Sequence, residues 1–85
     1  MTPQKLAEKL TNHGFLPNTE AGRWYETYEN GKSVFVGILR NENDCLGHCT
    51  VEIDIFNEQD EDYESEKTYI SCQSAWNAIK RTLHY

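Results

Sequence analysis

The chain has 85 residues, of which 38% are hydrophobic and 12% aromatic, and its formal net charge is −6. This length supports one domain over residues 1–85 with a modest core, and the aromatic content excludes a disordered tail. No apolar run approaches about 20 residues, the length that spans a bilayer, and the first five residues lack the apolar stretch of a secretion signal. We therefore expect a cytoplasmic protein that does not bind membranes.

The first predicted element is a helix that begins after Thr2. Thr2 can cap it and Pro3 suits its first position. Gly14 fits the left-handed position that ends a helix, and Phe15 can fold back as a Schellman motif requires. Residues 15–18 are then expected to lead into a loop. The apolar face of this helix is formed by Leu6, Ala7 and Leu10.

The strongest local signal in the chain is Asn30-Gly31, which lies between two alternating segments, 24–29 and 32–39. This pattern predicts a two-residue hairpin with a type I′ turn. A two-residue turn determines the register, so the facing pairs are Glu29 with Lys32, Thr27 with Val34, and Tyr25 with Val36. The opposite face then carries Trp24, Glu26, Tyr28, Phe35 and Leu39.

A third strand is predicted over residues 50–56, where polar and apolar side chains alternate. Two carboxylates cannot be buried unpaired, so the face with valine and isoleucine is the inner one. This inner face consists of Val51, Ile53 and Ile55, together with Val34, Val36 and Ile38 of the preceding strand. The other face carries Thr50, Glu52, Asp54 and Phe56.

The C-terminal part is expected to contain an acidic loop over residues 57–66, a short strand over 68–70 and a final helix capped by Ser71 or Ser74. The apolar stripe of that helix is Ala75, Trp76, Ile79 and Leu83, and its last turns hold Lys80, Arg81 and His84. Cations at that end complement the helix dipole. The predicted fold class is α+β, in the order α-β-β-β-(β)-α, with an antiparallel sheet and two helices packed on one face.

Charge is divided unevenly along the chain. Residues 41–66 contain ten acids and no base, whereas residues 1–40 carry a net +1 and residues 67–85 a net +3. Ordinary solubilising surfaces mix both signs, so we interpret the acidic segment as a docking surface for a basic partner. A solvated surface that maintains solubility is the alternative. The ten acids are Glu42, Asp44, Glu52, Asp54, Glu58, Asp60, Glu61, Asp62, Glu64 and Glu66.

Aromatic side chains add a second feature to this predicted surface. Trp24, Tyr28 and Phe35 share the outer face of the sheet with carboxylates, and an apolar patch surrounded by charge commonly marks a partner site. One alternative is that loop 57–66 or the N-terminal segment folds over these rings. Another is a homodimer formed through this face or through a sheet edge.

The cysteine-containing segment Cys45-Leu46-Gly47-His48-Cys49 does not predict a zinc site, because structural zinc requires four ligands and no second pair is present. We expect reduced thiols near a loop, with zinc binding and a Cys45–Cys49 disulfide as alternatives. Cys72 lies near a helix N-terminus, a position that lowers a thiol pKa. No phosphate-binding loop or Ser-His-Asp pattern is visible. The prediction is therefore a protein that is not an enzyme and uses no metal or cofactor.

The order helix, three strands, helix resembles the double-stranded RNA-binding domain, and residues 74–80 are similar to the final helix of that family. The family contacts phosphates through a lysine-rich start of this helix, whereas residues 69–73 contain no base. The resemblance therefore implies the topology and not RNA binding. In length, carboxylate clustering and lack of catalytic motifs, the chain also resembles small acidic phage-type inhibitors, such as anti-CRISPR proteins and other DNA mimics. That resemblance implies a protein that occupies a basic nucleic-acid-binding groove.

The functional prediction is a non-enzymatic inhibitor that docks on the basic surface of a nucleic-acid-binding effector or nuclease. Direct binding of nucleic acid is not expected, because neutralising phosphates requires clustered lysine and arginine. Two alternatives remain: an immunity protein or antitoxin that neutralises a basic nuclease, and an assembly protein that dimerises through the sheet. The expected contacts are the ten acids with Trp24, Tyr28 and Phe35, and the acidic loop is expected to be essential for binding.

Overall fold

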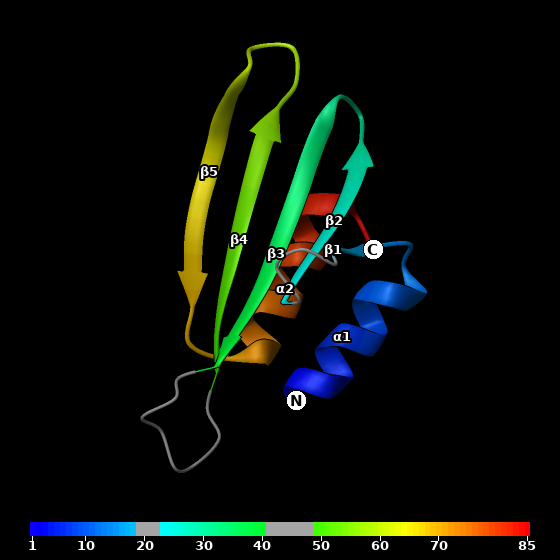
Figure 1. Cartoon of the computed structure of the whole chain (residues 1–85), viewed down its shortest axis with the longest axis vertical. Coiled ribbons are helices and arrows are strands. Elements are labelled where there is room, and N and C mark those ends of the chain that lie inside the picture. The colour runs from blue at the N-terminus through cyan, green and yellow to red at the C-terminus, as the bar shows by residue number, and fades with distance from the viewer. Residues whose placement is uncertain (19–22, 41–48) are drawn as a thin grey trace.

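The computed structural model describes residues 1–18, 23–40 and 49–85. Its elements, in chain order, are α1 (Pro3–Asn12), β1 (Leu16–Asn18), β2 (Trp24–Glu29), β3 (Lys32–Arg40), β4 (Cys49–Asn57), β5 (Asp62–Tyr69) and α2 (Cys72–Leu83). The five strands form one antiparallel sheet, in which each strand lies beside its neighbours in sequence (Figure 1). The predicted α+β class is confirmed, and the observed order is α-β-β-β-β-β-α.

The predicted ends of the first helix are confirmed by hydrogen bonds. The Thr2 hydroxyl accepts a bond from the backbone N–H of Lys5 at 3.1 Å. At the other end, Gly14 has φ +90°, and the N–H of Phe15 donates to the carbonyl of Leu10 at 3.0 Å. This is the 6→1 bond of a Schellman motif. It turns the chain sharply, so that Phe15 enters the core and β1 follows directly.

The β2–β3 hairpin has the predicted turn and register. Asn30 and Gly31 have φ values of +53° and +77°, the left-handed pair of a type I′ turn. The three predicted facing pairs are all present, as are the pairs of Trp24 with Gly37 and Glu26 with Phe35. The register places Val34, Val36 and Tyr25 on one face of the sheet, and Trp24, Tyr28 and Phe35 on the other.

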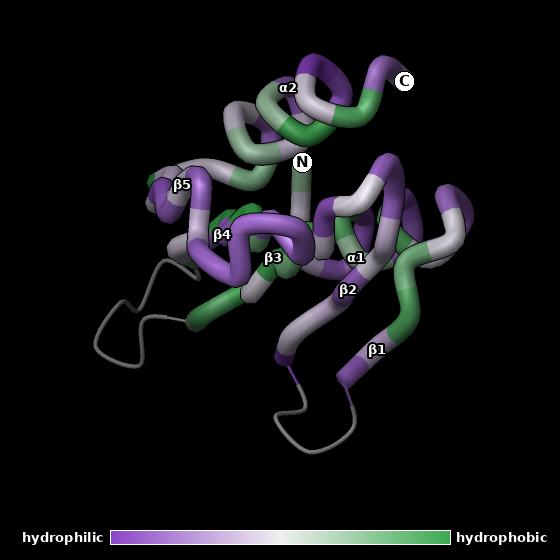
Figure 2. Tube along the Cα trace, turned by 90° about the horizontal axis from the view of Figure 1, so that it is seen from above, coloured by the Kyte–Doolittle hydropathy of each residue, from purple (hydrophilic) through white to green (hydrophobic). Residues whose placement is uncertain are grey.

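The core lies between the inner face of the sheet and the two helices. Viewed from above, α2 extends along one side of the central strands, and no described helix lies on the opposite side (Figure 2). The helix α1 contacts both α2 and β1. The buried residues are Leu6, Leu10, Phe15, Val34, Val36, Ile38, Cys49, Val51, Ile53, Cys72, Ala75, Trp76, Ala78, Ile79 and Leu83. The prediction that both helices cover the valine and isoleucine face is confirmed.

Two strands differ from the sequence prediction. Leu16–Asn18 was expected to enter a loop but pairs with Trp24–Glu26 as β1. Asp62–Tyr69 pairs along β4 over eight residues, so the predicted acidic loop is reduced to a turn over residues 58–61. Both segments are sheet edges, where backbone pairing needs few buried side chains. Most of the β5 side chains are exposed, which explains why no alternation of apolar residues identified this strand.

The turns of the two hairpins are joined at one end of the sheet (Figure 1). The N–H of Glu58 donates to the carbonyl of Gly31 at 3.1 Å, and the Ser33 hydroxyl donates to the Glu58 carboxylate at 2.6 Å. Within the β4–β5 turn, the side-chain oxygen of Asn57 accepts hydrogen bonds from the backbone N–H groups of Gln59 and Asp60. The acidic turn is therefore held in place by defined bonds. Neither helix is long or apolar enough to cross a membrane.

Candidate functional site

The face of the sheet opposite the helices, which we call the open face, is the candidate site. No described helix or strand lies over it (Figure 1). The strand register arranges its side chains in rows that run across the sheet, and three of these rows carry the rings and the carboxylates. The first of the three is Asn18, Trp24, Gly37, Glu52 and Thr68; the second is Leu16, Glu26, Phe35, Asp54 and Glu66; the third is Tyr28, Ser33, Phe56 and Tyr63. Leu39 and Thr50 form a further row beside the first.

The aromatic rings lie on the open face as predicted. Tyr28 is 64% exposed. The half-buried indole ring of Trp24 lies over Gly37 of the neighbouring strand and fills the space that a side chain at residue 37 would occupy. A Cβ built on Gly37 would be 2.7 Å from Cζ2 of that indole. Phe56 and Tyr63 pack edge to face, with ring centroids 5.1 Å apart. Neither β5 nor α1 covers the rings, so the alternative in which residues 57–66 or the N-terminal segment folds over them is wrong.

The substitution Gly37→Ala tests this position of Trp24. Its Cβ would overlap the indole, so we expect the ring to leave the sheet, the protein to lose about 1–2 kcal/mol of stability, and the tryptophan emission to shift to longer wavelength. Trp76 stays in the core and contributes a constant signal. In a Trp24→Ala background the same change is expected to be neutral or stabilising, because alanine suits a strand better than glycine. An equal loss of stability in both backgrounds would contradict the overlap.

Charge is separated between the two sides of the sheet. The three rows of the open face contain four carboxylates and neither lysine nor arginine. The strand lysines, Lys32 and Lys67, pair with Asn57 and Ile53 and therefore belong to the helix side. The open face thus presents negative charge beside aromatic rings, without the counter-charges that an ordinary mixed surface contains.

Asp54 is the most unusual residue of the open face. It lies in the middle row, between Phe35 on β3 and Glu66 on β5. Its Oδ1 is buried and has no hydrogen-bond partner in the described structure. Burial raises the pKa of Asp54 above its usual value of 3.8, and repulsion from Glu52 and Glu66 raises this pKa further. A carboxylate oxygen that is buried without a partner weakens the fold, so a positive group or a hydrogen-bond donor at this oxygen would be favourable.

The other acids of the β4–β5 hairpin have different surroundings. Asp60, Glu61 and Asp62 are exposed around the turn. Glu64 forms a 2.9 Å ion pair with Lys32 and accepts a 2.8 Å hydrogen bond from the Asn57 side chain. Both contacts lower the pKa of Glu64, and the hydrogen bond from Lys32 has the larger effect. Glu64 is thus already paired, and it points away from the open face. Glu42 and Asp44 lie outside the described residues.

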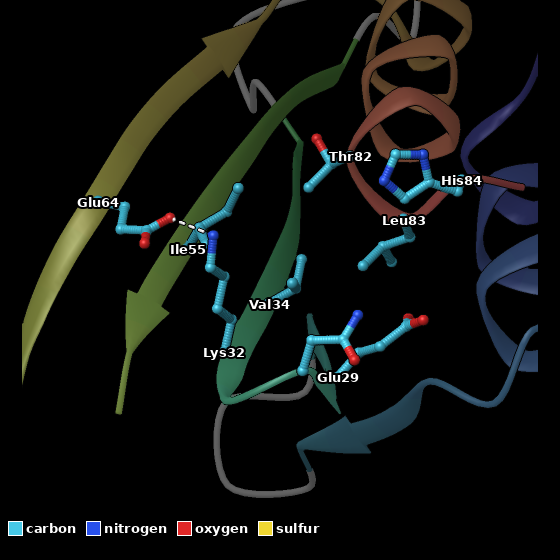
Figure 3. A pocket seen from close by; sticks show the side chains of 9 residues that line it. Glu29, Lys32, Val34, Ile55, Glu64, Thr82, Leu83 and His84 are labelled. Carbon is cyan, nitrogen blue, oxygen red and sulfur yellow. Dashed lines mark ion pairs between the residues drawn. The ribbon is translucent and has the colours of Figure 1, made fainter. Parts of the chain in front are cut away.

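A pocket of about 270 Å³ lies on the helix side, between the end of α2 and the hairpin turns (Figure 3). Its walls are formed by Glu29, Asn30, Lys32, Val34, Ile55, Glu64, Thr82, Leu83 and His84. Its one lysine, Lys32, is already bonded to Glu64. The volume is slightly below the range of about 300–1,000 Å³ that is usual for small-molecule sites. These features make the pocket a weaker candidate than the open face.

The cysteines depart from one prediction. Cys49 and Cys72 are both buried, and their Sγ atoms are 3.0 Å apart. Burial, followed by the hydrogen bond with Cys49, raises the pKa of Cys72 to about 12. The predicted lowering by the helix N-terminus is therefore wrong, because the loss of solvation outweighs it. Cys45 and His48 lie outside the described residues, and within residues 1–18, 23–40 and 49–85 no three metal-binding side chains form a cluster.

The sequence placed Trp24, Phe35 and Asp54 on this face but did not place Tyr63 and Glu66, because the predicted strand over residues 68–70 covers only the end of β5. No alternation of apolar and polar side chains runs along Asp62–Tyr69, and the irregularity in its pairing between Ile55 and Phe56 shifts the register there, so no periodic signal placed these two residues. Comparisons with protein-family models, curated proteins and solved structures found no match, so the functional conclusion depends on the residues and geometry of this chain.

Proposed function

We propose that this protein is a non-enzymatic inhibitor that docks through its open face on the basic nucleic-acid-binding surface of a larger protein. The observation that carries the proposal is Asp54, whose buried oxygen has no partner in the middle of an aromatic and acidic surface. A partner arginine or lysine would provide the missing charge. The proposal includes action in the cytoplasm, in the manner of the anti-CRISPR proteins and other phage-type DNA mimics that the chain resembles.

The chemistry of the open face suits arginine better than lysine. A guanidinium binds a carboxylate through two parallel hydrogen bonds and also stacks on aromatic rings. Asp54 has Phe35 opposite it on β3, and Glu52 and Glu66 flank it. Arginine is also common in proteins that bind phosphate and nucleic acid. A surface that holds several arginines for phosphates could therefore accept these carboxylates in their place.

Electrostatic steering and aromatic burial would have separate roles in this docking. Exposed acids around the β4–β5 turn would speed the encounter with a positive surface, because long-range attraction mainly affects the association rate. The half-buried rings of Trp24 and Phe35 would slow dissociation, because aromatic side chains dominate the energetic centres of interfaces. The two contributions are distinguishable, since only the first weakens strongly with added salt.

A symmetric dimer through the open face is a weaker proposal for the same surface. In a two-fold interface each patch meets its own copy, so Glu52, Asp54 and Glu66 of both copies would come together without a base between them. Like charges that meet in an interface cost several kcal/mol. A basic partner avoids that repulsion.

The proposal is tested by immobilising the 85-residue chain, exposing it to a lysate of the cells that produce it, and eluting bound protein in two ways. We expect a nucleic-acid-binding protein that is released by rising salt and, separately, by excess duplex DNA at low salt. The matched control is a variant in which the face acids Glu52, Asp54 and Glu66 are replaced by their amides. A partner that DNA does not displace, or that binds this variant equally well, would refute docking on a nucleic-acid site through the open face.

A further inference from the structure

The base of the β4–β5 hairpin carries two cysteines that the docking surface does not use. Cys49 is the first residue of β4 and shares the inner face with Val51 and Ile53, whereas Cys72 is the first residue of α2 and belongs to its buried stripe. The helix α2 packs on β4, and this packing brings the two Sγ atoms to 3.0 Å. The pair arises from residues that are 23 positions apart in the chain.

We propose that Cys49 and Cys72 form an intrachain disulfide when the protein meets a low-molecular-weight disulfide, and that this bond clamps the base of the acidic hairpin. An S–S bond is about 2.05 Å long, so the two sulfurs need to approach by only about 1 Å. The closed loop would run from the start of β4 to the start of α2. It would contain every acid of the described hairpin, from Glu52 to Glu66.

The reaction is a two-step thiol–disulfide exchange. One protein thiolate attacks a sulfur of oxidised glutathione, forms a mixed disulfide and releases one glutathione thiolate. The second protein thiol loses its proton and attacks the protein sulfur of the mixed disulfide, which releases the second glutathione. Two electrons pass from the protein sulfurs to the reagent, and the two thiol protons end on the two glutathione molecules.

Burial makes this exchange slow in the folded protein. Both thiols are almost inaccessible, at 7% exposure for Cys49 and 4% for Cys72, and the pKa of Cys72 is raised to about 12. Only the thiolate reacts, so exchange requires local opening of the first turn of α2. The same burial would shield a completed bond from reductants. The bond therefore acts as a stable cross-link at the base of the hairpin. Its formation is independent of what the open face binds.

The experiment uses the full chain and its Cys45→Ala variant, incubated with oxidised glutathione and analysed by intact mass and thermal unfolding. In the variant, Cys49 and Cys72 are the only cysteines left, so a monomer lighter by two hydrogen atoms must contain this bond. We expect that mass loss in both proteins, together with a rise in Tm of about 10 °C, which a reducing agent reverses only when the protein is opened by denaturant. Exchange is expected to accelerate in mild denaturant.

The matched control is Cys72→Ala, which leaves only Cys45 and Cys49 and is expected to give no stabilised, cross-linked monomer. The proposal would be overturned if Cys45→Ala gave only glutathione adducts or disulfide-linked dimers. It would also be overturned if Cys72→Ala gained the cross-link and the rise in Tm while Cys45→Ala did not, since the partner of Cys49 would then be Cys45. Because Cys45→Ala alone decides whether the bond forms, poor folding of Cys72→Ala would leave the test intact.

Discussion

Replacing Asp54 with asparagine is expected to stabilise the free protein and to weaken its complex. The change removes the charge of a half-buried carboxylate whose Oδ1 has no partner and which Glu52 and Glu66 repel. The new amide can also donate a hydrogen bond to either neighbour. We expect a gain of about 1 kcal/mol in the free energy of unfolding, which corresponds to a rise of about 5 °C in Tm for a domain of this size.

The same substitution removes the charge that a partner arginine would meet. Truncating one member of a buried, hydrogen-bonded charge pair costs about 2 kcal/mol or more, so the Kd of the captured partner should rise about thirtyfold. The matched control is Asp60→Asn, an identical change at an exposed turn position. It is expected to alter stability by less than about 0.5 kcal/mol. If Asp54→Asn lowered stability, or left binding unchanged, Asp54 would be a structural residue and not a docking residue.

The stabilisation by Asp54→Asn should depend on pH in a defined direction. The pKa of Asp54 is higher in the folded chain than its usual value of 3.8, so the folded state binds this proton more readily than the unfolded state. The penalty of the charged group is complete at neutral pH and disappears as the pH falls through the folded pKa toward 3.8. Urea unfolding of both proteins across this range should therefore give a stability difference that shrinks with acid. A difference that grew with acid would contradict the raised pKa.

Neutralising the acids of the open face should weaken partner binding far more than neutralising the same number of acids at the hairpin turn. The face variant combines Glu52→Gln, Asp54→Asn and Glu66→Gln. The turn variant combines Asp60→Asn, Glu61→Gln and Asp62→Asn. Each variant removes three negative charges, so the net charge changes from −6 to −3 in both. We expect the face variant to raise the Kd about hundredfold, mainly through faster dissociation.

The turn variant is expected to lower the association rate by a few-fold and to reduce its dependence on salt, because charges at the margin of an interface act mostly on the encounter. Surface plasmon resonance with the captured partner separates the two rate constants. Circular dichroism confirms that both variants fold. Equal effects would mean that net charge alone determines binding. A larger effect of the turn variant would move the site to the acidic turn, which belongs to the loop over residues 57–66 that the sequence predicts to be essential for binding, and would remove the open face from the mechanism.

The sequence by itself determined the elements whose signals are local. The Thr2 cap, the Schellman end at Gly14 and the Asn30-Gly31 turn depend on backbone conformations within a few residues, and each was found as predicted. Alternation over residues 50–56 likewise identified the inner and outer faces of the sheet, because successive side chains of a strand point to opposite sides. These signals placed Trp24, Phe35 and Asp54 on one face.

Tertiary structure alone decided which of the acids remain unpaired. Glu64 meets Lys32 across the sheet, whereas Asp54 meets two further acids and no base. Both outcomes depend on β5, an edge strand held by backbone hydrogen bonds that leave no apolar pattern in the sequence. The contact between Cys49 and Cys72 depends in the same way on how α2 packs against β4. Pairings between segments far apart in the chain are set by the packing of whole elements, which periodicity within one segment does not encode.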